Sequence, residues 1–311
     1  MSPPGTQREG APEAHGGRSG GGPVLWVLGT AQDGGVPQAG SERPAWLAEG
    51  ERRFATSLAI VDPEGGTRYL FEASPDFREQ LALLAELAPP STSRPARLPL
   101  DGIFLTHAHM GHYTGLAHLG FEALGAVGVP VYAMPRMAKF LRMNGPWSQL
   151  VSFRNIELRL LAHDTPVSLS DRLRVTPLLV PHRQEFSEVV GFRIEGPRRS
   201  ALFLPDIDSW ERWDAEGVRI EDQIRRVDVA YLDGTFFDDG EIPGRDMSGF
   251  PHPRIRGSMA RFADLPAAEK AKVRFLHLNH TNPVLDPDSD ARRETLAAGF
   301  RIAETGERFE L

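Results

Sequence analysis

The stretch Thr106-His107-Ala108-His109-Met110-Gly111-His112 carries three histidines within six residues, directly after the apolar run 103–105. That run predicts a strand ending in a tight loop, with a helix beginning near His112. In extended backbone, side chains two residues apart leave on the same side, so His107 and His109 point together. Neutral imidazole is the commonest protein ligand for zinc, iron and related metals. We therefore interpret the stretch as part of a metal site rather than as a polar loop.

The composition limits the classes of function. The chain has 311 residues, of which 41% are hydrophobic, and this suffices for a sizeable core. Its net charge is −7 with no large basic block, so we expect no nucleic-acid partner. Cysteine is absent, which excludes disulfides and thiolate ligands. Any metal must therefore be held by histidine, carboxylate, backbone or water.

The N-terminal segment differs from the rest of the chain. Residues 1–23 contain eleven glycines or prolines and almost no large apolar side chain, so we predict a disordered tail followed by one domain over residues 24–311. No apolar run approaches membrane-spanning length, and a basic-then-apolar signal pattern is missing. We expect a cytoplasmic protein without a membrane partner.

Apolar runs bounded by turn residues predict a mixed α/β architecture. The predicted strands are Val24–Leu28, Ser57–Val61, Arg68–Phe71, Val129–Ala133, Ile156–Leu161, Leu173–Val180, Val189–Ile194, Ala201–Leu204, Val227–Leu232, Val273–Leu276 and Gly299–Ala303. The predicted helices are Asp76–Leu87, Leu116–Leu124, Pro135–Met143, Glu221–Arg226, Met259–Lys272 and Ser289–Ala298.

A histidine or aspartate recurs at the carboxyl end of these predicted strands. The pattern occurs at His107, His182, Asp206, Asp233 and His277. Sheets that direct several strand ends toward one crevice use this layout for active sites, because loops there carry chemistry on a rigid base. One instance is uninformative, but five predict a shared site.

The order of these motifs resembles the metallo-β-lactamase superfamily, whose signature is His-x-His-x-Asp-His after a strand, followed by a single His, a single Asp and a late His. Within it, the chain resembles the pyrroloquinoline quinone (PQQ) biosynthesis protein B group. The matching segments are VLGTAQDGGVPQ at 27–38, ASPD at 73–76, LDGTF at 232–236 and HLNHTNP at 277–283. The resemblance implies an α/β fold of the αβ/βα four-layer sandwich type.

The resemblance also implies roles for particular residues. His107, His109 and His182 would form a first metal site, and Asp206 would bridge toward a second site containing His112. The implied cofactors are one or two divalent metal ions, Zn or Fe.

A carboxylate–histidine pair that assists proton transfer in nuclease and phosphodiesterase relatives would correspond to Asp233 and His277. His280 is a competitor for the role of that histidine. Glu304 is a stand-in for the last metal ligand of the superfamily, and His252 has no assigned role.

Two departures from the superfamily pattern matter. Gly111 stands where the signature has aspartate, which removes a ligand of the second metal. We therefore expect about one tightly bound metal, and we expect Gly111→Asp to raise the number toward two. The missing cysteines imply that the structural zinc of relatives is absent.

Three functions remain open on the sequence. The first is a metal-dependent enzyme of the PQQ biosynthesis protein B type, with oxidative chemistry at a single metal on a small-molecule precursor. The second is a hydrolase of an ester, lactone or phosphodiester that uses a metal-bound water. The third is a non-catalytic binding or carrier protein, for which Gly111 is the main support. The oligomeric state is left open.

Overall fold

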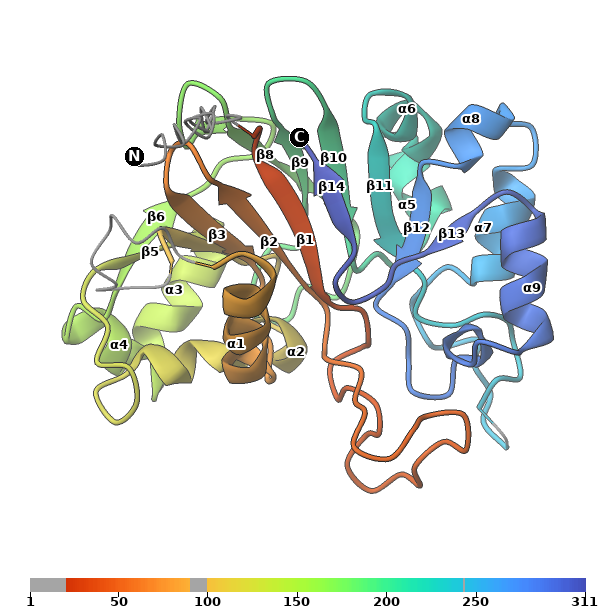
Figure 1. Cartoon of the computed structure of the whole chain (residues 1–311), viewed down its shortest axis with the longest axis horizontal. Coiled ribbons are helices and arrows are strands. Elements are labelled where there is room, and N and C mark those ends of the chain that lie inside the picture. Colours follow the sequence, from red (N-terminus) through yellow and green to blue (C-terminus); the bar gives the residue numbers. More distant parts are fainter. Residues whose placement is uncertain (1–20, 90–99, 243) are drawn as a thin grey trace, which may run out of the picture.

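The computed structural model describes residues 21–89, 100–242 and 244–311 (Figure 1). Most of the predicted tail, residues 1–20, lies outside the described residues. The described strands form two seven-stranded sheets. In spatial order, the first sheet contains β14 (Arg308–Glu310), β1 (Val24–Gly29), β2 (Ser57–Asp62), β3 (Thr67–Phe71), β4 (Gly102–Phe104), β5 (Val129–Ala133) and β6 (Ile156–Leu160). The second contains β13 (Arg301–Ile302), β12 (Val273–Leu276), β11 (Val229–Asp233), β10 (Ser200–Leu204), β9 (Val190–Glu195), β8 (Arg174–Leu179) and β7 (Val167–Ser168).

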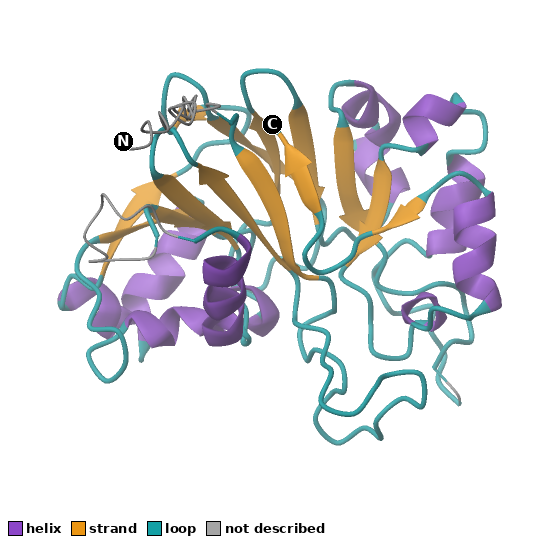
Figure 2. Ribbon diagram, in the orientation of Figure 1, coloured by secondary structure: helices purple, strands orange, loops and turns teal. Residues whose placement is uncertain are grey.

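Helices lie beside the sheets, away from the space between them, as Figure 2 shows. The first half of the chain contributes α1 (Phe77–Leu87), α2 (Met110–Tyr113), the 3₁₀ helix η1 (Thr114–Leu119), α3 (Pro135–Met143) and α4 (Trp147–Ser152). The second half contributes α5 (Trp210–Ala215), α6 (Ile220–Arg225), α7 (Ile255–Arg261), α8 (Ala267–Lys270), the 3₁₀ helix η2 (Pro283–Leu285) and α9 (Asp290–Ala297).

Three apolar layers separate four layers of secondary structure. In β1, Leu25 and Val27 pack between the two sheets, whereas Leu28 packs against the helices of the first half. In β10, Phe203 faces the inter-sheet layer and Leu202 faces the helices of the second half. This alternation follows from the two-residue period of a strand buried on both faces. The predicted αβ/βα four-layer sandwich is confirmed.

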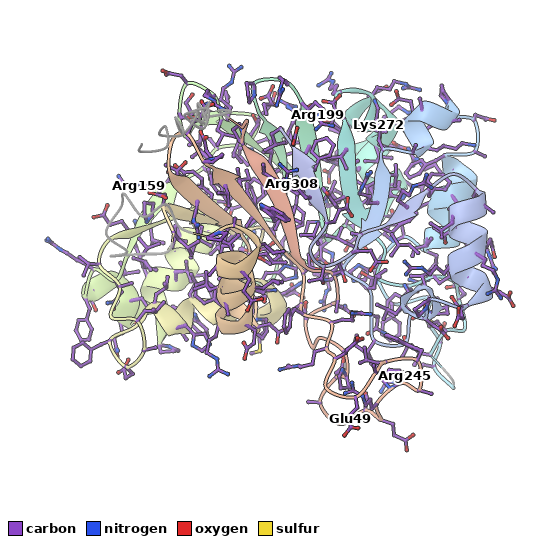
Figure 3. All side chains as sticks on the ribbon, viewed as in Figure 1. Glu49, Arg159, Arg199, Arg245, Lys272 and Arg308 are labelled. Carbon is purple, nitrogen blue, oxygen red and sulfur yellow. The ribbon has the colours of Figure 1, made fainter. Side chains whose placement is uncertain are left out.

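Both sheets are mixed, and their parallel strands run in a common direction within each sheet. Lys272 immediately precedes β12, and Figure 3 places it at the edge of the molecule opposite Arg245 and Glu49. The carboxyl end of β12 therefore points toward the edge of the molecule where Arg245 and Glu49 lie. The predicted site residues follow strand ends at this edge, as expected for sheets with crossover connections.

Two predicted helices differ from the structure. Leu116–Leu124 is not one α-helix, because η1 ends at Leu119 and residues 121–124 form a turn. Met259–Lys272 is divided into α7 and α8, because Pro266 lacks the amide hydrogen that a continuous helix needs there. None of the described helices is both long and apolar enough to cross a bilayer.

Candidate metal centre

The histidine loop after β4 brings three imidazoles together. His107 Nε2 lies 2.8 Å from His109 Nδ1, and the ring centroids of His107 and His112 are 4.2 Å apart. His109 caps α2 in extended backbone, and His112 returns from the helix toward the loop. The sequence prediction that these side chains converge is confirmed.

A first cluster consists of His107, His109 and His182, whose nearest ring nitrogens all lie within 4.8 Å of one another. His182 reaches the other two from the loop after β8 in the second sheet. Asp206, two residues beyond β10, lies beside this cluster, with Oδ1 3.7 Å from His182 Nε2 and Oδ2 3.8 Å from His107 Nε2. The predicted first site is thus assembled from both halves of the chain.

A second cluster consists of Asp33, His112 and His277. Asp33 Oδ1 lies 3.3 Å from His112 Nε2 and 3.4 Å from His277 Nε2. Asp206 also touches this cluster, because its Oδ2 lies 3.0 Å from His112 Nε2 and 3.5 Å from His277 Nε2. Asp206 therefore stands between the two clusters, as the resemblance implied. The sequence analysis did not single out Asp33, which places a second carboxylate beside this cluster.

Hydrogen bonds at the far nitrogens assign the histidine tautomers in the first half of the site. The Thr106 hydroxyl donates to Glu72, so it accepts from His107 Nδ1, 2.8 Å away. His112 Nδ1 donates to Glu72 Oε1 at 3.2 Å, and His109 Nε2 donates to Glu185 Oε2 at 3.2 Å. The other ring nitrogen of each imidazole faces the clusters: His107 Nε2 and His109 Nδ1 lie 2.8 Å apart, and His112 Nε2 lies 3.0 Å from Asp206 Oδ2.

The second half of the site is arranged in the same way. His182 Nδ1 donates to Asp208 Oδ1 at 3.0 Å. The Thr235 hydroxyl donates to Asp233 Oδ1 at 2.7 Å and accepts from His277 Nδ1 at 3.0 Å. Such partners on the far nitrogen are the usual support of metal-binding histidines, since they fix the ring and the tautomer.

Three buried polar atoms at the centre have no hydrogen-bond partner among the described residues, namely His182 Nε2, Asp206 Oδ2 and His277 Nε2. Leaving such atoms unpaired costs about 1–3 kcal/mol each. In a tetrahedral site with ligands ~2.0–2.1 Å from zinc, ligand atoms are about 3.3 Å apart. The 3.0–3.5 Å separations around His112 and His277 match this value. The residues present therefore fit divalent metal ions.

The pKa values of the central residues are shifted in different directions. Burial, followed by the charge on His112, holds the pKa of His107 well below its ordinary value, which keeps that imidazole neutral. Burial opposes the charge on Asp206, but His277 and His112 hold the pKa of its carboxyl well below the usual range. For His112, burial is outweighed by Glu72 and Asp206, which raise its pKa well above the ordinary value.

The backbone is strained at His277 and at Glu72, each of which directly follows the end of a strand. Their φ angles are +60° and +76°, in the left-handed region that costs a non-glycine residue roughly 1–2 kcal/mol. Such strain gathers at functional sites, where the surroundings hold it in place. Here it brings the His277 ring to the second cluster and the Glu72 carboxylate to His112.

The other predicted residues lie as follows. Asp233 is fully buried, and its closest histidine partner is His252 Nδ1 at 2.8 Å, so it reaches His277 only through Thr235. His280 contacts the Asn279 side chain and belongs to none of the metal-capable groups found among the described residues. Glu304 is exposed and pairs with Arg292, away from both clusters.

Comparison with known proteins agrees with this geometry. A family model described as the beta-lactamase superfamily domain matches residues 67–273. The chain belongs to the metallo-β-lactamase superfamily. Its fold is therefore that of an established superfamily, and the resemblance stated on the sequence is confirmed.

Two curated metallo-β-lactamase relatives are both named coenzyme PQQ synthesis protein B. The protein from Methylobacterium sp. (strain 4-46) is 29% identical over 311 residues, covering 90% of this chain and 97% of the relative. The protein from Xanthomonas campestris pv. campestris (strain B100) is 27% identical over 307 residues, with the same coverage.

Two solved structures share the fold. Zn²⁺-bound PqqB from Methylobacterium extorquens has a TM-score of 0.75 and 24% identity, covering 93% of this chain and 100% of that chain. A diphosphatase of the PhnP family has a TM-score of 0.63 and 22% identity, covering 93% of this chain and 97% of that chain. Both support the two-sheet architecture, which positions the clusters described above.

Proposed function

We propose that this protein is a metal-dependent hydrolase that holds two divalent ions and acts on an ester, lactone or phosphodiester of a small molecule. The supporting observation is the place of Asp206 between two clusters of converging imidazole nitrogens. When bound in such a site, two ions lower the pKa of a water molecule and polarise the oxygen of the bond to be cleaved. The side chains of this protein would bind the ions, exclude bulk water and transfer protons.

The Asp233–His252 pair is arranged for proton transfer. His252 Nδ1 donates to Asp233 Oδ2 at 2.8 Å, so its Nε2 is left to accept a proton or to give one to a leaving group. Asp233 is held in place by the backbone amides of Ile207 and Thr235, at 3.0 and 2.9 Å. His252 thus takes the acid–base role that the sequence resemblance gave to His277, whose free nitrogen belongs to the second cluster.

Replacing His252 by glutamine is expected to lower turnover by about 100-fold, the usual scale for a general acid or base, with the metal content unchanged. Steady-state kinetics and elemental analysis of the same preparation check this. His280→Gln is the matched control and should behave as the wild type. A loss of metal from His252→Gln would show instead that His252 is a ligand.

Oxidative chemistry on a PQQ precursor is the second candidate function. It is favoured by the similarity to proteins named coenzyme PQQ synthesis protein B and by the composition of the second cluster. Asp33, His112 and His277 form a two-histidine, one-carboxylate set, the ligand type of non-haem iron oxygenases. This function needs dioxygen as co-substrate.

Elemental analysis of protein purified without chelator or a polyhistidine tag, combined with activity assays, tests the proposal. Two zinc ions per chain and hydrolysis of chromogenic esters or phosphodiesters are expected. Iron with oxygen consumption would favour the oxidative function instead. A chain that takes up no metal would contradict both and leave the binding or carrier role.

A further inference from the structure

The space beside Gly111 is already filled. A Cβ atom built at Gly111 would lie 2.0 Å from Asp33 Oδ1, 2.3 Å from Asp33 Cγ and 2.7 Å from Asp33 Cα. Non-bonded contacts this short are essentially never made by a Cβ atom. Rotating the Asp33 side chain would not relieve the contact with the Asp33 Cα. Gly111 itself does not have a positive φ, so its backbone does not call for glycine. The glycine is required for space, because Asp33 occupies the position of its side chain.

The turn that carries Asp33 is tied to the strand end that carries His277. The Gln32 amide donates to the Leu278 carbonyl at 2.8 Å, and the Leu278 amide donates to the Thr30 carbonyl at 2.9 Å. Figure 1 shows the segment after β1 leaving the sheet between the two halves of the molecule. These backbone bonds hold Asp33 beside His277 without help from its side chain.

The Asp33 carboxylate completes the second cluster. Its Oδ1 lies 3.3 and 3.4 Å from His112 Nε2 and His277 Nε2, whose other nitrogens already donate to Glu72 and Thr235. Asp206 Oδ2 is the fourth atom of the group. Two imidazoles and two carboxylates form an ordinary ligand set for a divalent ion.

We propose that Asp33 is the carboxylate ligand of the second metal ion, in place of the aspartate that the superfamily signature has at position 111. In this exchange of ligand positions, glycine at 111 leaves the space that the Asp33 side chain occupies. The inference rests on the proposed two-metal function. It reverses the sequence expectation for Gly111→Asp, because an added aspartate would displace Asp33 rather than supply a missing ligand.

Zinc titration of the chelator-treated full chain, followed by elemental analysis, tests the exchange. The wild type is expected to bind two Zn²⁺ ions. Asp33→Ala should bind one, and Gly111→Asp should also lose the second ion through the clash. Gln32→Ala, which alters the neighbouring turn side chain, is the control and should bind two.

The outcomes separate this inference from the proposed function. Two ions in wild type and in Asp33→Ala, with equal affinity, would overturn the ligand role of Asp33 and leave a two-metal hydrolase intact. One ion in the wild type would overturn both. Asp33→Asn keeps the size of the side chain but removes its charge, and this variant should also lose the second ion. This test does not depend on whether the Gly111 variants fold. Thermal unfolding of each variant confirms that the fold is kept.

Discussion

Replacing Asp206 by alanine is expected to remove both metal ions and to lower turnover by at least about 1,000-fold. Asp206 is the residue whose two carboxylate oxygens approach ligand nitrogens of both clusters. Its charge also offsets the repulsion between two cations a few ångströms apart. Because bound metal contributes several kcal/mol of transition-state stabilisation, its loss corresponds to this rate effect.

Elemental analysis and steady-state kinetics check the Asp206 prediction. Asp264→Ala removes an exposed carboxylate from the loop between α7 and α8 and serves as the control, with unchanged metal and rate. An Asp206→Ala protein that is folded and still carries two ions would contradict the bridging position. Circular dichroism distinguishes metal loss from loss of fold.

Replacing His109 by alanine is expected to remove the first ion while the second remains. His109 belongs to the first cluster alone, and its side chain is 17% exposed on a loop outside the apolar layers. The fold should therefore survive its removal. Turnover should fall by about 100- to 1,000-fold, since one of two ions that share the reaction is lost.

His280→Ala is the matched control for His109→Ala, because it removes a partly buried histidine that lies in neither cluster. The measurement is the zinc content of each variant after dialysis against metal-free buffer. Unchanged zinc in His109→Ala would remove His109 from the ligand set. The three alanine variants therefore have different expected results. His109→Ala should lose the first ion, Asp33→Ala the second, and Asp206→Ala both.

The sequence predicted a shared site because its members follow apolar strands, and the family resemblance grouped His107, His109 and His182 within it. His107 and His109 are neighbours on one strand end, and His182 and Asp206 each follow a run that reads clearly as a strand. Such local patterns need no knowledge of the fold. The assignment of these residues as ligands remains a prediction, which the convergence of their ring nitrogens supports.

Asp33 and His252 could not be assigned from the sequence for a physical reason. Asp33 lies in a glycine-rich turn, where aspartate is an ordinary turn residue, and its place is decided by backbone bonds to Leu278 at the far end of the chain. His252 lies in a segment rich in glycine and proline without periodicity. Gly111 was the one indication of Asp33 in the sequence. Because the signature aspartate is missing at that position, another carboxylate could be expected to replace it.

The proposed metal ligands come from both halves of the sandwich, so bound ions would cross-link the two packed sheets. His107, His109 and His112 lie on the first half, whereas His182, Asp206 and His277 lie on the second. Whatever free energy the ions contribute is therefore shared with the docking of one half onto the other. By reciprocity, aromatic contacts of the inter-sheet layer that are not themselves ligands, such as Phe71 against Phe203, would contribute to metal affinity.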